Sequence, residues 1–168
     1  MKCYVIPAPK GIDSLTLVER PDPTPGPRQV LVRVRATSLN YRDLLTVEAQ
    51  SARAAPKPDL IPLSDGAGEV VAVGPGVSRV KVGDRVAGCF MQKWVGGADR
   101  RQPAAQASAM GGAIDGMLTE LAVLEEDGVV KLPAGISASR KAPPCRAPAS
   151  PPGMRWSRSA TSRPATSC

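Results

Sequence analysis

Hydrophobic and polar residues alternate most clearly in the stretch VLVRVRA, residues 30–36. Leu31, Arg33 and Arg35 occupy one set of alternate positions, and three valines and an alanine occupy the other. Because successive side chains of a strand point to opposite faces, this period of two predicts a β-strand with one polar face. Shorter runs rich in β-branched residues predict further strands at 2–6, 15–19, 68–73, 84–88 and 118–124.

Glycine and proline separate these runs at short intervals. The stretches PDPTPGPR and VGPGVSRVKVGD predict turns, since proline fixes φ and glycine permits positive φ. Residues 40–47 predict one or two helical turns, and the small, polar, Gly-rich residues 99–117 predict a long loop. Several short strands with few helices predict a mainly β domain, built as a barrel or a sandwich.

The net charge of +7 belongs almost entirely to the C-terminal part of the chain. Residues 1–137 hold 16 basic and 15 acidic residues, whereas residues 138–168 hold six basic residues and no acidic one. The first 137 residues therefore have no bulk electrostatic attraction for phosphate, and we expect no nucleic acid among the partners.

The four cysteines, Cys3, Cys89, Cys145 and Cys168, are far apart and form no C-x-x-C motif. The sequence shows no signal-peptide pattern and no apolar run approaching 18 residues. These features predict a soluble, reduced, cytoplasmic protein with no membrane partner. Cys3 and Cys89 are expected to be small buried hydrophobic residues.

Three stretches carry a family resemblance: VLVRVRATSLNYRDLL, PLSDGAGEVVAVGPGVSRVKVGDRVAG and GMLTELAVLEEDGVVKLPAGIS. In this order they resemble the N-terminal domain of the medium-chain dehydrogenase/reductase superfamily, which includes zinc alcohol dehydrogenases and zinc-free quinone oxidoreductases. The second stretch is the most specific, since it joins a G-x-G turn, a strand, a V-G-x-G-V turn and a K-x-G-D-R-V ending. The resemblance implies a GroES-like, partly open β-barrel over residues 1–137. In the family this barrel normally precedes a Rossmann domain, and catalysis takes place in the cleft between the two domains.

The zinc ligands of the family are not matched in this sequence. Where zinc members have a cysteine and a histidine ligand, this chain has Asn40 and Ser64. Zinc sites in proteins are built from thiolate, imidazole or carboxylate donors, and an open site still needs three protein ligands. The chain contains no histidine, and residues 86–117 contain Cys89 alone where the structural zinc lobe has four cysteines. We therefore expect no metal.

The resemblance to zinc-free members implies roles for five residues. Asn40 and Tyr41 would be catalytic: the amide would hydrogen-bond a carboxamide or a substrate carbonyl, and the phenol would supply a proton or orient that carbonyl. Four residues would contact NADH or NADPH: Asn40, Asp43, Ser64 and Asp65. Simpler roles stay open, namely Asp43 as a helix cap or local ion-pair partner, and Ser64 and Asp65 as turn residues.

No dinucleotide-binding fingerprint occurs in the sequence. GAGEVV and GPGVSR each begin with G-x-G, but neither supplies the third glycine or opens a predicted helix. Both lie beside alternating valines, so they predict turns and bulges. Residues 1–168 are therefore expected to lack a Rossmann domain and to be inactive without one.

Residues 138–168 are rich in Pro, Ser, Ala and Arg and contain one aromatic residue, Trp156. This composition cannot bury enough apolar area to fold, so it predicts a disordered tail. After KLPAGIS the family typically continues with a segment such as FEEAATLPCAGVTAWNALV. Codons compatible with the tail, read in a shifted frame, permit SFEEGATLPGAGVTAWNALV. We interpret the tail as an out-of-frame sequence that begins near Ser137.

These observations predict the substrate-side domain of a zinc-independent, NAD(P)(H)-dependent oxidoreductase. It would transfer hydride to or from a carbonyl, quinone or activated alkene of a small-molecule substrate, and full-length relatives are expected to be homo-oligomers. Two other functions stay open: a GroES-like scaffold without catalysis, and weak nucleic-acid binding through the basic tail.

Overall fold

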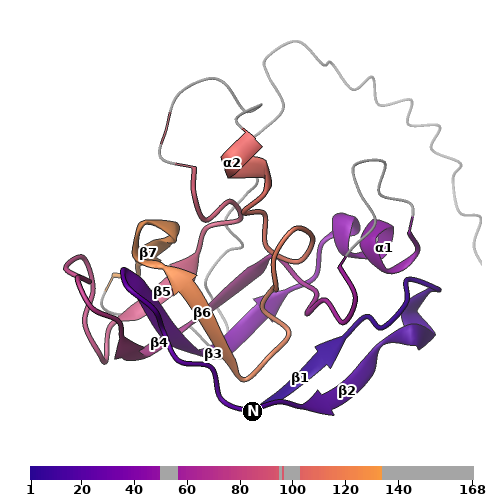
Figure 1. Ribbon diagram of the computed structural model, residues 1–168, viewed down its shortest axis with the longest axis horizontal. Coiled ribbons are helices and arrows are strands. Elements are labelled where there is room, and N and C mark those ends of the chain that lie inside the picture. The colour runs from indigo at the N-terminus through magenta and orange to yellow at the C-terminus, as the bar shows by residue number, and fades with distance from the viewer. Residues whose placement is uncertain (50–56, 95, 97–102, 134–168) are drawn as a thin grey trace, which may run out of the picture.

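The computed structural model describes residues 1–49, 57–94, 96 and 103–133, which form seven strands and four short helices (Figure 1). The strands are β1 (Lys2–Val5), β2 (Thr16–Glu19), β3 (Gln29–Ser38), β4 (Asp65–Val73), β5 (Arg85–Gly88), β6 (Leu121–Glu125) and β7 (Val129–Lys131). The α-helices are α1 (Tyr41–Val47) and α2 (Pro103–Gln106), and the 3-10 helices are η1 (Ile12–Ser14) and η2 (Glu126–Gly128).

The alternating stretch at residues 30–36 forms most of β3, the longest strand described. Val30 and Val32 are fully buried, whereas Arg33 and Arg35 are exposed. The predicted polar face is therefore confirmed. The predicted strands at 2–6, 15–19 and 84–88 also form, and the predicted helical turns at 40–47 form α1.

Three predictions of element boundaries were incomplete. Strand β4 begins at Asp65, before the predicted run, because its ladder with β3 extends to that residue. Residues 118–120 lie outside β6 and bond to β1 as well as β3: the Tyr4 N–H donates to the Leu118 carbonyl, and the Val34 N–H donates to the Glu120 carbonyl, both at 3.0 Å. The predicted loop 99–117 contains α2, and the three-residue β7 was missed.

The main sheet curls into a partly open barrel. Its strand order is β6-β3-β4-β5-β7, and every neighbouring pair is antiparallel. Strands β6 and β7 lie at opposite edges of this order, yet only η2 separates them in the chain. The two edges must therefore approach one another, as Figure 1 shows. Strands β1 and β2 form a separate antiparallel ribbon.

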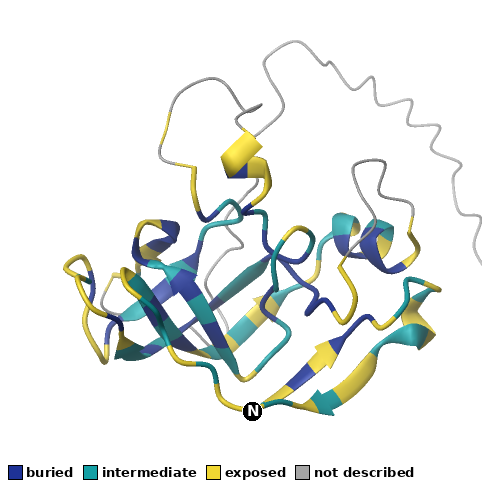
Figure 2. Ribbon diagram, in the orientation of Figure 1, coloured by how far each residue is buried: buried dark blue, intermediate teal, exposed yellow. Residues whose placement is uncertain are grey.

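The largest hydrophobic cluster lies inside the curled sheet. Its buried members are Val30, Val32, Val70, Val80, Val86, Met110, Met117, Ala122, Leu124 and Val129. Figure 2 shows buried and more exposed positions alternating along the strands, as a sheet with one covered face requires. A smaller cluster joins Cys3 and Val5 to Ile61 beneath the β1–β2 ribbon. The predicted burial is confirmed for Cys3 and wrong for Cys89, which is half-buried.

The glycines of the GAGEVV stretch serve strand packing rather than phosphate binding. Gly66 and Gly68 lie within β4, whose pairing with β3 shifts register between Val34 and Ala36. A Cβ atom on Gly68 would lie only 2.1 Å from the Arg33 carbonyl oxygen, so the two strands could not approach this closely with any other residue. The predicted role of this glycine beside a bulge is confirmed.

Several predictions concern residues outside the described part of the chain. The domain boundary at residues 137 and 138, the disordered tail and the frame change near Ser137 all fall there. Within the described residues, no helix has the length and apolar character needed to cross a membrane.

Candidate functional site

The predicted site residues gather where the chain leaves β3 and enters α1. Asn40 is the N-cap of α1, with extended backbone angles of φ −126° and ψ 155°. The Asp43 carboxylate turns back and accepts a hydrogen bond from the Asn40 N–H at 2.8 Å, which completes a capping box. This pairing satisfies backbone donors that the first helical turn would otherwise leave open.

A second carboxylate holds the Asn40 side chain. The Asn40 Nδ2 atom donates to Asp65 Oδ2 at 2.8 Å. Asp65 is the first residue of β4 and is paired with Ser38, so the β3–β4 ladder places it beside the start of α1. Because an ionised carboxylate can only accept hydrogen bonds, Asp65 fixes which end of the amide faces it.

Asp43 is buried, and its Oδ1 atom has no hydrogen-bond partner. The nearest cation recorded is the Arg42 guanidinium, whose Nη1 atom lies 3.8 Å from that oxygen. Burial raises the pKa of Asp43 above its ordinary value of 3.8, while the Asn40 hydrogen bond and Arg42 oppose the rise and Asp65 adds to it. The simpler role considered for Asp43, a helix cap beside a local ion pair, is therefore present in the structure.

Tyr41 follows Asn40 and Ser64 precedes Asp65 in the chain, but among the described residues no recorded side-chain hydrogen bond joins either of them to this cluster. Tyr41 opens α1 and is 74% exposed, and the neighbouring Leu39 is 81% exposed. Ser64 is buried immediately before β4. The structure thus brings Asn40, Asp43 and Asp65 into contact, and the cofactor and catalytic roles of all five residues stay predictions.

Sequence reasoning considered Arg42 only as a side chain that Asp43 or Asp65 would fix, and it indicated no contact of Arg42 elsewhere in the fold. Its guanidinium reaches from α1 to the Met110 carbonyl at 3.0 Å and lies 4.6 Å from the centre of the Phe90 ring. The carbonyl contact spans 68 residues of sequence, so no local pattern could indicate it. A signal available in the sequence was the position of Arg42 directly before Asp43.

The residues at the family's catalytic metal position do not fit zinc. Asn40 offers a neutral amide that is already hydrogen-bonded to Asp65, and Ser64 offers a neutral hydroxyl. Across the described residues, no group of three or more Cys, Asp or Glu side chains is placed to hold a metal ion, and the sequence has no His.

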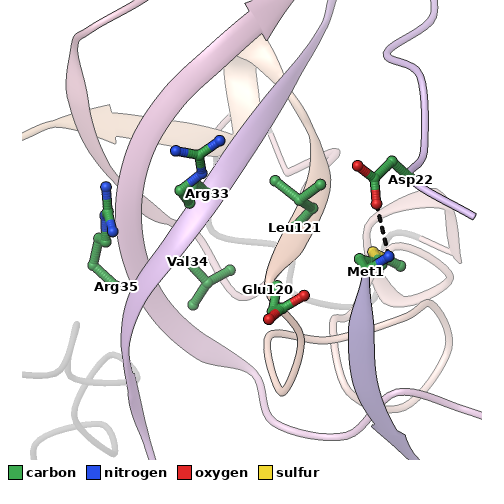
Figure 3. Close-up of a pocket in the computed structure, with 7 residues that line it drawn as sticks. All are labelled: Met1, Asp22, Arg33, Val34, Arg35, Glu120 and Leu121. Carbon is green, nitrogen blue, oxygen red and sulfur yellow. Dashed lines mark hydrogen bonds and ion pairs between the residues drawn. The ribbon is translucent and has the colours of Figure 1, made fainter. Parts of the chain in front are cut away.

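A shallow pocket of about 460 Å³ lies away from these residues, between β3 and the N-terminus (Figure 3). Its lining consists of Met1, Asp22, Arg33, Val34, Arg35, Glu120 and Leu121. Arg33 pairs with Leu121, and the Val34 N–H donates to the Glu120 carbonyl. Arg33 and Glu120 therefore project from opposite faces of the sheet, and the pocket does not gather its charged groups around one ligand.

Comparison with known protein families decides the membership of this fold. Residues 26–134 match the family model described as the alcohol dehydrogenase GroES-like domain, which covers more than half of the chain. The chain belongs to this family. The predicted medium-chain dehydrogenase/reductase resemblance and the predicted GroES-like fold are thereby confirmed.

Relatives of this GroES-like domain include a vesicle membrane protein homolog, a quinone oxidoreductase and an alcohol dehydrogenase with bound metal. The synaptic vesicle membrane protein VAT-1 homolog of Rattus norvegicus is 47% identical over 88 residues, 51% of this chain and 22% of its own length. A quinone oxidoreductase of Pseudomonas syringae matches with a TM-score of 0.62 and 31% identity, over 82% of this chain and 35% of that chain. A cobalt- and zinc-bound thermostable alcohol dehydrogenase from Pyrobaculum aerophilum matches with a TM-score of 0.66 and 30% identity, over 78% of this chain and 41% of that chain. The GroES-like domain thus spans less than half the length of these relatives.

Proposed function

We propose that this GroES-like domain is the substrate side of an NADH- or NADPH-dependent oxidoreductase that acts without zinc on a small-molecule carbonyl, quinone or activated alkene. The observation that carries the proposal is the half-buried Asn40 at the start of α1, whose backbone N–H donates to the Asp43 carboxylate and whose side-chain amide donates to the Asp65 carboxylate. The similarity to an alcohol dehydrogenase and a quinone oxidoreductase supports the reaction class.

In this proposal the residues of the chain bind and orient the substrate. Asn40 keeps one amide N–H beyond the one given to Asp65, and this N–H donates to the substrate oxygen. The exposed Tyr41 hydroxyl donates the proton that the carbonyl oxygen acquires when hydride adds to the carbonyl carbon. The bound nicotinamide supplies that hydride. Asp65 holds the side-chain amide directly, and Asp43 holds the backbone N–H of Asn40.

The apolar surface around Asn40 supports a covered site. Leu39 and Tyr41, on either side of Asn40 in the chain, are the two most exposed of the large hydrophobic residues described, and Leu44 on the same helix is 40% exposed. In the full-length protein we place the cofactor domain over this surface, where it would exclude water from the reacting atoms.

Zinc independence rests on the donor chemistry of Asn40 and Ser64. The balanced charge of residues 1–137 supports a small-molecule partner rather than a nucleic acid, and the spacing of the cysteines supports a cytoplasmic location. Homo-oligomer formation is proposed for the full-length protein alone.

A thermal-shift titration with NADPH tests the proposal. Residues 1–168 should show no shift, because GAGEVV lies in β4, GPGVSR lies in a turn, and neither opens a helix of the described residues that could bind phosphate. A second protein, encoded by the alternative frame from Ser137 onward, should show a clear rise in melting temperature. Absence of a nicotinamide-dependent shift in that second protein contradicts the proposal and favours a scaffold without catalysis.

A binding assay separates the nucleic-acid alternative. Residues 1–168 should show no detectable binding to a single-stranded oligonucleotide at 150 mM salt, although residues 138–168 carry six basic residues and no acidic one. Steeply salt-dependent binding that disappears when residues 138–168 are removed contradicts the proposed absence of a nucleic-acid partner.

A further inference from the structure

Arg42 connects α1 to a segment that is distant in the sequence. Its Nη1 atom donates to the Met110 carbonyl at 3.0 Å and lies 3.5 Å from the Gly111 carbonyl. Its guanidinium also stacks over the Phe90 ring, with 4.6 Å between the central carbon and the ring centre. The side chain is only about one-third exposed, so these contacts are partly shielded from water.

The residues that Arg42 contacts lie at the two ends of one excursion of the chain. The Met110 N–H donates to the Phe90 carbonyl at 3.0 Å, and Met91 forms an isolated bridge with Ala109. These bonds close the base of the excursion that leaves the barrel after β5 and returns before β6. Arg42 therefore contacts both ends of the excursion at its base: the ring of Phe90 where it begins and the carbonyl of Met110 where it returns.

Arg42 also faces the candidate site. It is the cation within 4 Å of Asp43 among the described residues, at 3.8 Å from the Oδ1 atom that has no hydrogen bond. The other Asp43 oxygen accepts the Asn40 N–H. A path of direct contacts thus runs from the excursion through Arg42 and Asp43 to Asn40.

We infer that Arg42 is a positioning residue of the candidate site: it anchors α1 to the base of the 89–112 excursion and holds Asp43 where it caps the helix beneath Asn40. A planar guanidinium suits this role, because it donates to carbonyls in its plane while its face lies on the ring. The inference rests on the proposed function only in treating Asn40 as a substrate-binding residue, because the contacts of Arg42 are present in the structure itself.

Nuclear magnetic resonance on the isotope-labelled chain tests this role without any enzyme assay. The Met110 N–H is protected by its bond to the Phe90 carbonyl, and opening the chain there also breaks the bond from Arg42 to the Met110 carbonyl. In Arg42→Gln this opening costs roughly one hydrogen bond less, so the Met110 amide should exchange with solvent about tenfold faster. The pKa of Asp43 should rise further, since a nearby cation is removed. The Asn40 side-chain amide signals should shift as well.

Two further variants separate charge from geometry. Arg42→Lys keeps the cation but loses the planar contacts, so it should accelerate Met110 exchange with little change in the pKa of Asp43. Phe90→Leu removes the ring beneath the guanidinium and should shift the Asn40 signals in the same direction as Arg42→Gln. It also provides the measurement if Arg42→Gln does not fold.

Arg79→Gln is the matched control, because Arg79 also bridges a carbonyl and a carboxylate, those of Glu126 and Asp127. It should leave the Asn40 signals and the pKa of Asp43 unchanged. The inference is overturned if the Arg42 and Phe90 variants leave both readouts unchanged, or if Arg79→Gln changes them equally. A failure of the proposed function would instead appear as absent hydride transfer with these readouts intact.

Discussion

Asp43 gives the candidate site a pH dependence of defined sign. Burial raises the pKa of its carboxyl in the folded state above the ordinary 3.8, so the folded state binds the proton more tightly than the unfolded chain. The contribution of Asp43 to the free energy of unfolding is therefore fully present below about pH 3.8 and is lost as the pH rises through the folded pKa.

Asp43→Asn should remove this dependence while an amide oxygen still accepts the Asn40 N–H. Relative to the parent chain, the free energy of unfolding of the variant should increase with pH above about 4 and then level off. Urea denaturation at a series of pH values measures this difference. A difference that is constant or that falls with rising pH contradicts the assignment.

Glu126 should show the opposite sign. This buried carboxylate accepts the backbone N–H groups of Ser78 and Arg79 at 2.8 and 3.2 Å and lies 2.9 Å from the Arg28 guanidinium. The two backbone hydrogen bonds, with help from Arg28, lower the pKa of Glu126 below its usual 4.5. Its contribution to stability is therefore present above pH 4.5 and is lost as the pH falls through the folded pKa.

Glu126→Gln should consequently lower the melting temperature at pH 7, and the difference from the parent should shrink as the pH falls below 4.5. Circular dichroism melts of both proteins at pH 7 and at a pH below 4.5 measure this difference in melting temperature. Lys10→Gln changes an exposed charge and serves as the control. An equal loss at both pH values would mean that the carboxylate charge does not carry the effect.

At the scale of elements, the close approach of β3 and β4 depends on Gly68. A Cβ atom there meets the backbone of Arg33, which cannot move aside as a side chain can. Gly68→Ala should therefore destabilise the fold by about 1–3 kcal/mol. In Gly26→Ala the added atom meets the flexible Gln29 side chain at 3.1 Å, so that variant should be close to neutral. Equal effects in denaturant titrations would contradict the close approach.

The sequence predicted elements where burial leaves a local pattern and failed where contacts are distant. Strand β3 was predictable because Val30 and Val32 point inward while Arg33 and Arg35 point outward. Strand β7 was missed because three residues are too few to show a period, and its pairing with β5 spans over 40 residues.

The contacts of the candidate site also divide into those that a local sequence pattern indicates and those that depend on distant parts of the chain. The cap formed by Asn40 and Asp43 depends on a spacing of three residues, which a sequence displays directly. The bond from Asn40 to Asp65 depends on the register of β3 against β4, and the bond from Arg42 to Met110 depends on the path of the whole excursion. Only the family resemblance placed Asp65 near Asn40 in advance.

At the scale of the whole molecule, the donor set predicts indifference to zinc. Addition of Zn²⁺ should leave the melting temperature of residues 1–168 unchanged, since a ligand that binds the native state would raise it. Calorimetric titration provides a second measurement. A rise in melting temperature that saturates at a stoichiometric amount of Zn²⁺, and that Asn40→Ala together with Ser64→Ala abolishes, would contradict zinc independence.

The central claim is that these residues form the substrate side of a hydride-transferring enzyme. A fusion tests it most directly: residues 1–133 joined to the remaining part of the Pseudomonas syringae quinone oxidoreductase, whose own matching part has the same fold. The fused protein should oxidise NADPH with a quinone or a carbonyl acceptor. Asn40→Ala should lower kcat/KM roughly tenfold, as the loss of one hydrogen bond to the reacting oxygen does. A folded fusion that binds NADPH but transfers no hydride, or that reacts equally well with Asn40→Ala, would contradict the account.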